Sequence, residues 1–398
     1  MDKILVVVLD GLGDRVYAEL DGLTPLETAK TPTLDLLATN SICGMLYPLG
    51  VSIRPSSDVA HMALFGLNYK LEYTGRGPIE LIGLGVQMTA NDLALRGNFA
   101  IVNKDGIVID RRVERKPPPA KLLHELMRVV IDEYSFELHH IAEHRFALKI
   151  TGVGLSSDIT DSDPHVEGVH LSKVYPTDGS SEAACRTAHL VNTYIERVCS
   201  ILTKCDEYAA TSILLRGVGT LPNWHDFSKR YHLKSACITN NALYNGIGSL
   251  LGMDVVLPKR YSDYNCYYCD IESLAIQALT EYDFVFLHLQ EADLFGEDGD
   301  LYGKIAVIEK MDSALKFVNS LSSNILVAVT SDHSTPCCLK AHSGDPVPVL
   351  FHGEGLRNDA VSKYGERFFS MGGLGTIEGK DFMPTIMNFL GRAKLKGS

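Results

Sequence analysis

Long runs of apolar residues recur along this chain and predict the strands of a buried sheet. They cover Lys3–Leu9, residues 283–289, Ile325–Thr330 and residues 347–351. Runs rich in Val, Ile and Leu without polar alternation are typical of parallel strands covered on both faces. Between the second and third runs, apolar residues return at helical spacing, at Ile305, Ile308, Met311, Leu315, Val318 and Leu321. The order strand, helix, strand predicts a βαβ unit with a right-handed crossover.

The middle of the chain has a different pattern. Glycines interrupt short alternating segments there, and Pro117-Pro118-Pro119 introduces a predicted helix over residues 120–132. A strand over residues 146–150 and a long helix over residues 182–203 follow. Near the end of the chain, a last helix over residues 382–390 stops at Gly391, because glycine commonly terminates helices.

These patterns divide the chain into two domains. At 398 residues the chain exceeds the size at which single hydrophobic cores usually stop growing. We predict an α/β fold in which residues 1–70 and 232–398 form one discontinuous, doubly wound domain. An α+β domain of residues 71–231 is inserted into it, with joins near residues 66–73 and 221–231.

Composition narrows the classes of function. With 45% hydrophobic and 22% charged residues, the chain has the composition of an ordinary soluble protein. Its net charge of −12 argues against nucleic acid or an anionic membrane as the partner. No apolar stretch is long enough to span a membrane, and the apolar run before Asp10 lacks a signal-peptide cleavage site. We therefore expect a cytoplasmic protein.

The nine cysteines are scattered without the spacing of a disulfide framework. Cys266-x-x-Cys269 lacks the second pair of a zinc ribbon. Buried or incidental thiols are the favoured interpretation, for these and for Cys337-Cys338.

Oxygen and nitrogen donors follow the predicted strands. Open α/β sheets bind ligands outside the carboxyl ends of their strands, so residues far apart in sequence can meet there. Mixed oxygen and nitrogen ligands without a thiolate suit Mn²⁺, Mg²⁺ or Zn²⁺, and a serine among them suggests two-metal phosphoryl transfer. The candidates are Asp10, Ser57, Asp58, His61, His288, Asp293, Glu297, Asp300, Asp332, His333, His342 and Asp345.

Each candidate taken alone also has a simpler interpretation. Asp10 can be a turn residue, and Asp10-Gly11-Leu12-Gly13 is no dinucleotide fingerprint because Val16 replaces its third glycine. Ser57 precedes a helical segment and can be only a helix cap. As a nucleophile, it would gain from the helix dipole and from a bound cation.

The predicted insertion holds candidate anion-binding residues. Arginine pairs bidentately with phosphate and carboxylate, so a small phosphorylated acid would suit such a set. Arg96-Gly97-Asn98 and Arg216-Gly217 are the better candidates, because an adjacent glycine lets a ligand approach the backbone. Asp161-x-Asp163-Pro164-His165 fits a polar wall of this site or a turn. The arginines concerned are Arg76, Arg96, Arg111, Arg112, Arg115 and Arg216.

The motifs together resemble those of a known family, the archaeal-type 2,3-bisphosphoglycerate-independent phosphoglycerate mutases of the alkaline phosphatase superfamily. The resemblance runs nearly from end to end. It is carried by Asp10-Gly11-Leu12-Gly13-Asp14-Arg15, Thr24-Pro25-Leu26-Glu27, Ser57-Asp58-x-Ala60-His61, residues 73–80 (YTGRGPIE), Arg96-Gly97-Asn98, residues 161–165, Ser331-Asp332-His333, His342 and Pro346-Val347-Pro348.

The resemblance implies an enzyme that interconverts 3- and 2-phosphoglycerate in glycolysis and gluconeogenesis through a phosphoserine, without 2,3-bisphosphoglycerate. The nucleophile would be Ser57, beside two divalent cations, Mn²⁺ or Mg²⁺ with Zn²⁺ and Co²⁺ as alternatives. One ion would be held by Asp10, Ser57, Asp332 and His333, and the other by Asp293, Glu297 and His342. The implied phosphoglycerate-binding residues are His61, Arg76, Arg96, Asn98, Arg111, Arg112, His165 and Arg216.

Two positions depart from the family pattern. Glu297 stands where the motif Asp-x-x-Gly-His has its imidazole, and Asn245 stands where relatives carry a lysine. A carboxylate at the first position favours harder ions, and loss of the lysine removes a cation near the transferred phosphate. A metal-dependent phosphomonoesterase and a weakly active or non-catalytic phosphoacid-binding paralogue therefore stay open as alternatives. A homo-oligomer is compatible with the sequence.

Overall fold

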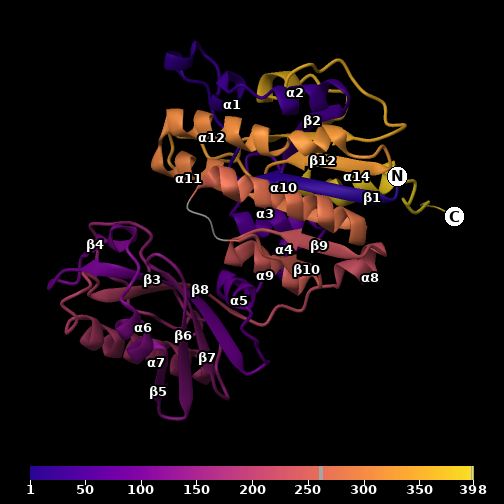
Figure 1. Cartoon of the computed structure of the whole chain (residues 1–398). Helices are drawn as coiled ribbons and strands as arrows, with labels where there is room; N and C mark the ends of the chain where they lie inside the picture. The colour runs from indigo at the N-terminus through magenta and orange to yellow at the C-terminus, as the bar shows by residue number, and fades with distance from the viewer. Residues whose placement is uncertain (260–262, 396, 398) are drawn as a thin grey trace. The chain divides into compact units, whose positions relative to one another are not determined.

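The computed structural model describes residues 1–259, 263–395 and 397, which fold into two compact units (Figure 1). The first unit contains Met1–Glu72, Trp224–Asn240 and Ile247–Ser398. The second contains Tyr73–Asn223 and Asn241–Gly246. The mixed α/β fold predicted from the sequence is confirmed.

The first unit is built on an eight-stranded sheet in the order β10-β9-β11-β1-β12-β13-β2-β14. The five strands from β10 to β12 are parallel, and β13 runs antiparallel to both of its neighbours. β14 is parallel to β2. The bounds are β1 Lys3–Leu9, β2 Ile42–Tyr47, β9 Ser235–Ile238, β10 Asp254–Val256, β11 Phe284–Leu289, β12 Ile325–Thr330, β13 Val347–His352 and β14 Gly375–Glu378.

Helices cover both faces of this sheet, because alternate residues of the central strands point to opposite sides. On one side, Leu5, Val7 and Leu9 of β1 share a core with residues of α2, α10 and α12. On the other side, Phe65 at the end of α3 packs on the rings of Phe284 and Phe286. The helices are α1 Pro25–Thr28, α2 Pro32–Thr39, α3 Ser57–Leu64, α4 Tyr69–Glu72, α8 Phe227–Tyr231, α9 Ala242–Leu250, α10 Tyr264–Glu281, α11 Glu291–Asp298, α12 Leu301–Ala314, α13 Glu366–Phe369 and α14 Gly379–Phe389, with α9 shared between the units.

The second unit is an antiparallel sheet with the order β4-β3-β7-β6-β5, in which β8 also pairs with β3. Helix α7 packs on it through a separate core. The elements are α5 Arg76–Gly83, β3 Asp92–Val102, β4 Val108–Asp110, α6 Ala120–Leu126, β5 Arg128–Ile131, β6 Tyr134–Ala142, β7 Arg145–Thr151, α7 Glu182–Leu202 and β8 Ser212–Thr220.

Two predicted helices are wrong in their second halves. The helix expected over residues 120–132 ends at Leu126, and residues 128–131 form β5. Val129 and Ile131 alternate inward there, and the segment pairs with β6. The helix expected to reach Leu321 ends at Ala314, and the 3-10 helix Lys316–Ser320 follows.

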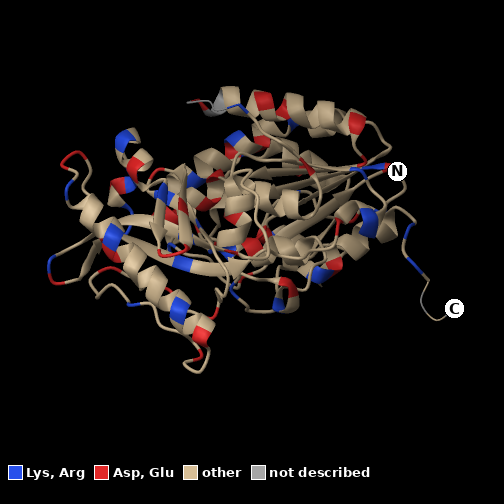
Figure 2. Cartoon of the chain, turned by 90° about the horizontal axis from the view of Figure 1, so that it is seen from below, with Lys and Arg blue, Asp and Glu red and all other residues tan. Residues whose placement is uncertain are grey.

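Charged residues lie mostly on helices and loops, and the strands seen at the centre of Figure 2 are largely free of them. Strands β2, β11, β12 and β13 contain no Asp, Glu, Lys or Arg. In the described part of the chain, every helix is too short or too polar to cross a membrane.

Candidate active site

Three adjacent parallel strands end at one edge of the larger sheet. In the register of β1, Leu9 lies beside Leu289 of β11, and Val8 lies beside Thr330 of β12. The residues that follow these strands therefore emerge side by side. The Asp10 amide still donates to the Leu289 carbonyl at 2.8 Å, which fixes the start of the first loop.

The first cluster of donors lies at this edge. Asp10, Asp332 and His333 are buried, and one potential ligand atom from each lies within 4.8 Å of the others. His333 Nε2 is 3.4 Å from Asp10 Oδ1 and 3.2 Å from Asp332 Oδ2. Two carboxylates and an imidazole in this arrangement suit a divalent cation.

Ser57 joins this cluster as the first residue of α3. Its hydroxyl is buried and lies 3.1 Å from His333 Nε2. The N-cap of α3 is Ser56, whose backbone is extended, so Ser57 does not occupy the capping position. The hydroxyl therefore faces the candidate ligands from the amino-terminal turn of a helix, where the backbone favours anions.

A short chain of hydrogen bonds orients His333. The Thr335 hydroxyl donates to Asp293 Oδ1 at 2.7 Å, so it can only accept from His333 Nδ1, 3.0 Å away. The Nδ1–H tautomer leaves the Nε2 lone pair directed at Asp10, Asp332 and Ser57. Such a second hydrogen bond is the usual means of orienting an imidazole ligand.

A second cluster contains Asp293, His333 and His342, again with ligand atoms within 4.8 Å of one another. His342 Nδ1 donates to the Pro55 carbonyl at 2.9 Å, which leaves Nε2 as an acceptor 3.7 Å from Asp293 Oδ1. Glu297 lies four residues after Asp293 on α11, on the same helix face. It is absent from the clusters found among the described residues.

The site brings several buried carboxylates together without a cation among them, which shifts their pKa values. Burial raises the pKa of Asp293 well above 3.8, and repulsion from Asp10 and Glu297 adds to the shift. Burial and the Asp10 charge raise the pKa of Asp332 in the same way. Burial and the neighbouring His342 lower the pKa of His333 well below 6.5. A bound cation would stabilise the ionised form of both carboxyls and the neutral form of His333, so the donor set fits divalent metal ions.

Two other histidines, His61 and His288, contact residues of the first cluster or Ser57. His61 is fully buried, and its Nδ1 donates to the Ser57 carbonyl at 2.7 Å. Burial and the nearby His288 lower its pKa to about 3. His288 Nε2 is 3.4 Å from Asp10 Oδ2. In this structure, His61 thus contacts Ser57 through its backbone carbonyl, and the predicted role of His61 in substrate binding stays a prediction.

The second unit holds a separate cluster of arginines around two buried carboxylates. Glu80 Oε1 lies 2.7 Å from Arg76 Nε and 3.6 Å from Arg96 Nε. Asp163 accepts a bidentate pair from Arg111, at 3.0 and 2.7 Å, and a further bond from Arg216 Nη1 at 2.5 Å.

The sheet register brings these two carboxylate-centred groups together, because Arg96 of β3 pairs directly with Arg216 of β8. Like charges opposite each other destabilise a sheet. Burial and the charge of Arg76 lower the pKa of Arg96 well below 12.5, against the attraction of Glu80. The arginines outnumber the carboxylates, so this cluster has the charge of an anion-binding site.

The remaining predicted substrate residues lie at different depths. Asn98 is buried and donates to the Arg111 carbonyl at 3.3 Å. The Arg112 amide donates to Asp110, and its side chain is near His144. His165 is exposed, in a left-handed backbone conformation, with Nε2 3.4 Å from Asp161.

The sequence patterns did not single out Arg145 or His144, although both belong to the arginine cluster. Arg145 pairs with Asn98 across β3 and β7 and acts on the pKa values of Glu80 and Arg96. Burial lowers the pKa of His144 to about 3, and the Arg145 charge adds to this. Their position directly before the apolar strand 146–150 was the available signal.

Comparison with known proteins gives the family. A model described as Metalloenzyme superfamily matches residues 2–389. A 2,3-bisphosphoglycerate-independent phosphoglycerate mutase from Thermoplasma volcanium is 37% identical, over 100% of this chain and 99% of that protein. The enzyme of the same name from Methanococcus maripaludis strain C5 is also 37% identical, over the full length of both chains.

Solved structures agree with this assignment. A protein from Pyrococcus horikoshii has a TM-score of 0.82 and 30% identity, and the match covers 100% of this chain and 99% of that chain. The cofactor-independent phosphoglycerate mutase from Thermoplasma acidophilum has a TM-score of 0.68 and 33% identity, and the match covers 98% of this chain and 100% of that chain. The resemblance of the motifs is confirmed: this chain belongs to the metalloenzyme superfamily and, within it, to the 2,3-bisphosphoglycerate-independent phosphoglycerate mutases.

Proposed function

We propose that this chain interconverts 3-phosphoglycerate and 2-phosphoglycerate without 2,3-bisphosphoglycerate, through a phosphoserine at Ser57. The observation that carries the proposal is the buried Ser57 hydroxyl, 3.1 Å from His333 Nε2 and beside a cluster that includes Asp10 and Asp332. A hydroxyl placed among metal-type ligands at a helix N-terminus is suited to accept a phosphoryl group.

The two clusters of ligands would hold the two divalent cations. Asp10, Asp332 and His333 with Ser57 would bind one, and Asp293 and His342 with Glu297 would bind the other. Bound there, the ions would act as Lewis acids that stabilise the charge on the attacking and leaving oxygens. Mn²⁺ and Mg²⁺ are our first candidates, because the donors are oxygens and imidazole nitrogens without a thiolate.

The reaction would proceed in two phosphoryl transfers. Ser57 Oγ forms a bond to phosphorus as the bond from phosphorus to the 3-oxygen of the substrate breaks, and the serine proton passes to that oxygen. The 2-hydroxyl of the glycerate then takes the phosphoryl group back, and its proton returns to Ser57. No water is consumed, so the reaction is an isomerisation.

The second unit would bind the substrate anion. Its arginines supply planar, bidentate donors that match a phosphate or a carboxylate. We propose that Arg76, Arg96, Arg111 and Arg216 hold these groups, with Glu80 and Asp163 keeping the guanidinium planes in place. In this scheme the first unit carries the metals and the second unit carries specificity.

An enolase-coupled assay on protein stripped with a chelator tests the proposal. Mn²⁺, Mg²⁺, Co²⁺ and Zn²⁺ are added one at a time with 3-phosphoglycerate as substrate. We expect activity only with metal and without added 2,3-bisphosphoglycerate. Phosphate release faster than formation of 2-phosphoglycerate would assign a phosphomonoesterase instead, and ligand binding without turnover would assign a non-catalytic paralogue.

A further inference from the structure

Lys304 is a fully buried lysine in the first turn of α12, which begins at Leu301. Lysine is almost never fully buried unless its charge is paired, because burying an ammonium without partners is costly. Lys304 also lies on the buried stripe of the helix, together with Leu301, Ile308 and Met311. A lysine in an apolar stripe is thus a sequence signal for an internal polar contact.

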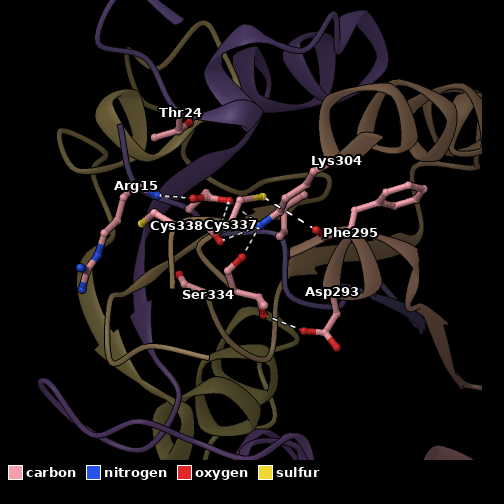
Figure 3. A network of polar contacts seen from close by, with 12 residues as sticks. Arg15, Thr24, Asp293, Phe295, Lys304, Ser334, Cys337 and Cys338 are labelled. Atoms are coloured by element: carbon pink, nitrogen blue, oxygen red, sulfur yellow. Dashed lines mark hydrogen bonds and ion pairs between the residues drawn. The ribbon is translucent and has the colours of Figure 1, made fainter. Parts of the chain in front are cut away.

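Three oxygens accept hydrogen bonds from the Lys304 ammonium. They are Asp14 Oδ2 at 2.9 Å, the Gly13 carbonyl at 3.1 Å and the Thr335 carbonyl at 2.9 Å. An ammonium has three N–H donors, so each donor has its own acceptor. Figure 3 shows the Lys304 side chain pointing toward the segment that carries Ser334 and Cys337.

The acceptors belong to the two loops that carry the first cluster. Gly13 and Asp14 follow β1 and Asp10, and Thr335 follows β12, Asp332 and His333. The loops are also joined directly, since the Thr335 amide donates to the Gly13 carbonyl at 3.0 Å. Asp14 Oδ2 accepts a further bond from the Cys337 amide at 3.2 Å.

The connection continues from Lys304 to the ligands themselves. Its acceptor Thr335 uses its own hydroxyl to bond His333 Nδ1 and Asp293 Oδ1, as described above.

We infer that Lys304 is a positioning residue for the metal centre: it clamps the loops after β1 and β12 so that Asp10, Asp332 and His333 converge on one cation. The inference rests on the metal site of the proposed function and not on phosphoryl transfer. Mutation of residues that hydrogen-bond to metal ligands and orient them commonly lowers metal affinity by about 10- to 100-fold.

The test compares Mn²⁺ binding by the full-length, metal-stripped protein and its Lys304→Met variant, measured by calorimetry and by electron paramagnetic resonance. We expect Mn²⁺ affinity to fall about 10- to 100-fold. The matched control is Lys310→Met, an exposed lysine on the same helix, which should leave the affinity unchanged. Wild-type affinity in folded Lys304→Met would overturn the inference.

A second variant separates positioning from loss of stability. Lys304→Met alone leaves the Asp14 carboxylate buried without its cation, which can unfold the protein. The double variant Asp14→Asn/Lys304→Met leaves neither charge buried, so we expect its melting temperature to recover while Mn²⁺ affinity stays low. Recovery of both would reduce Lys304 to a structural role. Wild-type protein that binds Mn²⁺ but has no mutase activity would contradict the proposed function and leave this inference standing.

Discussion

Each of the two units holds a cluster of charged side chains, acidic in the first unit and mainly basic in the second, and the two clusters are built by different structural means. In the first unit, short carboxylate and imidazole side chains are fixed at the ends of adjacent parallel strands, as Asp10 and Asp332 are. In the second unit, long arginine side chains are held by bridging carboxylates: Asp163 binds both Arg216 of β8 and Arg111, which directly follows β4.

Each cluster is prepared for a ligand of opposite charge. In the first unit, hydrogen bonds from the backbone and from Thr335 hold the ligand side chains in place. The raised pKa values of Asp293 and Asp332 indicate that these carboxyls lack a neighbouring positive charge. The arginine cluster already contains two counter-charges but keeps an excess of cations. A cation would complete the first cluster, and a phosphorylated acid would complete the second.

The largest effect should come from Ser57, the proposed nucleophile. We expect Ser57→Ala to lower mutase activity by about a thousandfold or more, because the phosphoryl group loses its acceptor. The neighbouring Ser56→Ala is the matched control, since Ser56 is exposed and lies outside the ligand cluster. The enolase-coupled assay measures both. Full activity in Ser57→Ala would remove the link between the acidic cluster and the chemistry.

A smaller effect should come from the arginine cluster. Arg96→Gln should raise KM and lower kcat/KM by about 10- to 100-fold, as expected for loss of a hydrogen bond to a charged group. Arg128 offers a control in the same unit, because it is exposed on β5 and bonds Ser135. Equal losses in Arg96→Gln and Arg128→Gln would show that the cluster has no special role.

Metal preference should change with Glu297. Its carboxylate favours hard ions, so Glu297→His should shift the ratio of activities toward Zn²⁺ and Co²⁺ relative to Mg²⁺. We expect a change of about tenfold or less, because the other ligands stay in place. Activity titrations with each ion measure it, and an unchanged order of metals would exclude Glu297 from the coordination shell.

The smallest effects should appear as opposite pH trends in stability. In metal-free protein, the raised pKa of Asp332 makes its stabilising contribution decline as pH rises above 3.8, so Asp332→Asn should gain stability over wild type toward alkaline pH. Burial alone would raise the pKa of Glu80, but Arg96 and Arg76 lower it below 4.5. The contribution of Glu80 is therefore lost as pH falls, and the deficit of Glu80→Gln should shrink in acid.

Thermal melting at several pH values measures these differences, which should amount to a few degrees. Trends of the same sign in both variants would contradict the contrast between the units.

The sequence was informative where structure depends on local pattern. Lys3–Leu9 and Ile325–Thr330 were predicted with their observed bounds, because buried parallel strands are continuous apolar runs. These two strands could be predicted without knowing which strands pair with them. The prediction of a helix over residues 120–132 was wrong in its second half, because that segment pairs with β6 as a strand. Such a pairing depends on another segment of the chain and not on the local pattern.

The same distinction holds for the candidate site. The donors after β1 and β12 could be grouped in advance, since strand ends of a parallel sheet meet at one edge. The contact of Arg145 with the arginine cluster depends on its register opposite Asn98, which no local pattern reveals. The contacts of Lys304 could not be predicted, because its ammonium bonds the backbone carbonyls of Gly13 and Thr335. The positions of these carbonyls are set only when the two loops fold.

Anomalous diffraction at the manganese edge, from crystals soaked with Mn²⁺, tests the proposed metal centre directly. We expect one peak among Asp10, Asp332 and His333 within bonding distance of Ser57 Oγ, and a second peak beside Asp293 and His342. Peaks elsewhere, or none within reach of the Ser57 hydroxyl, would contradict it.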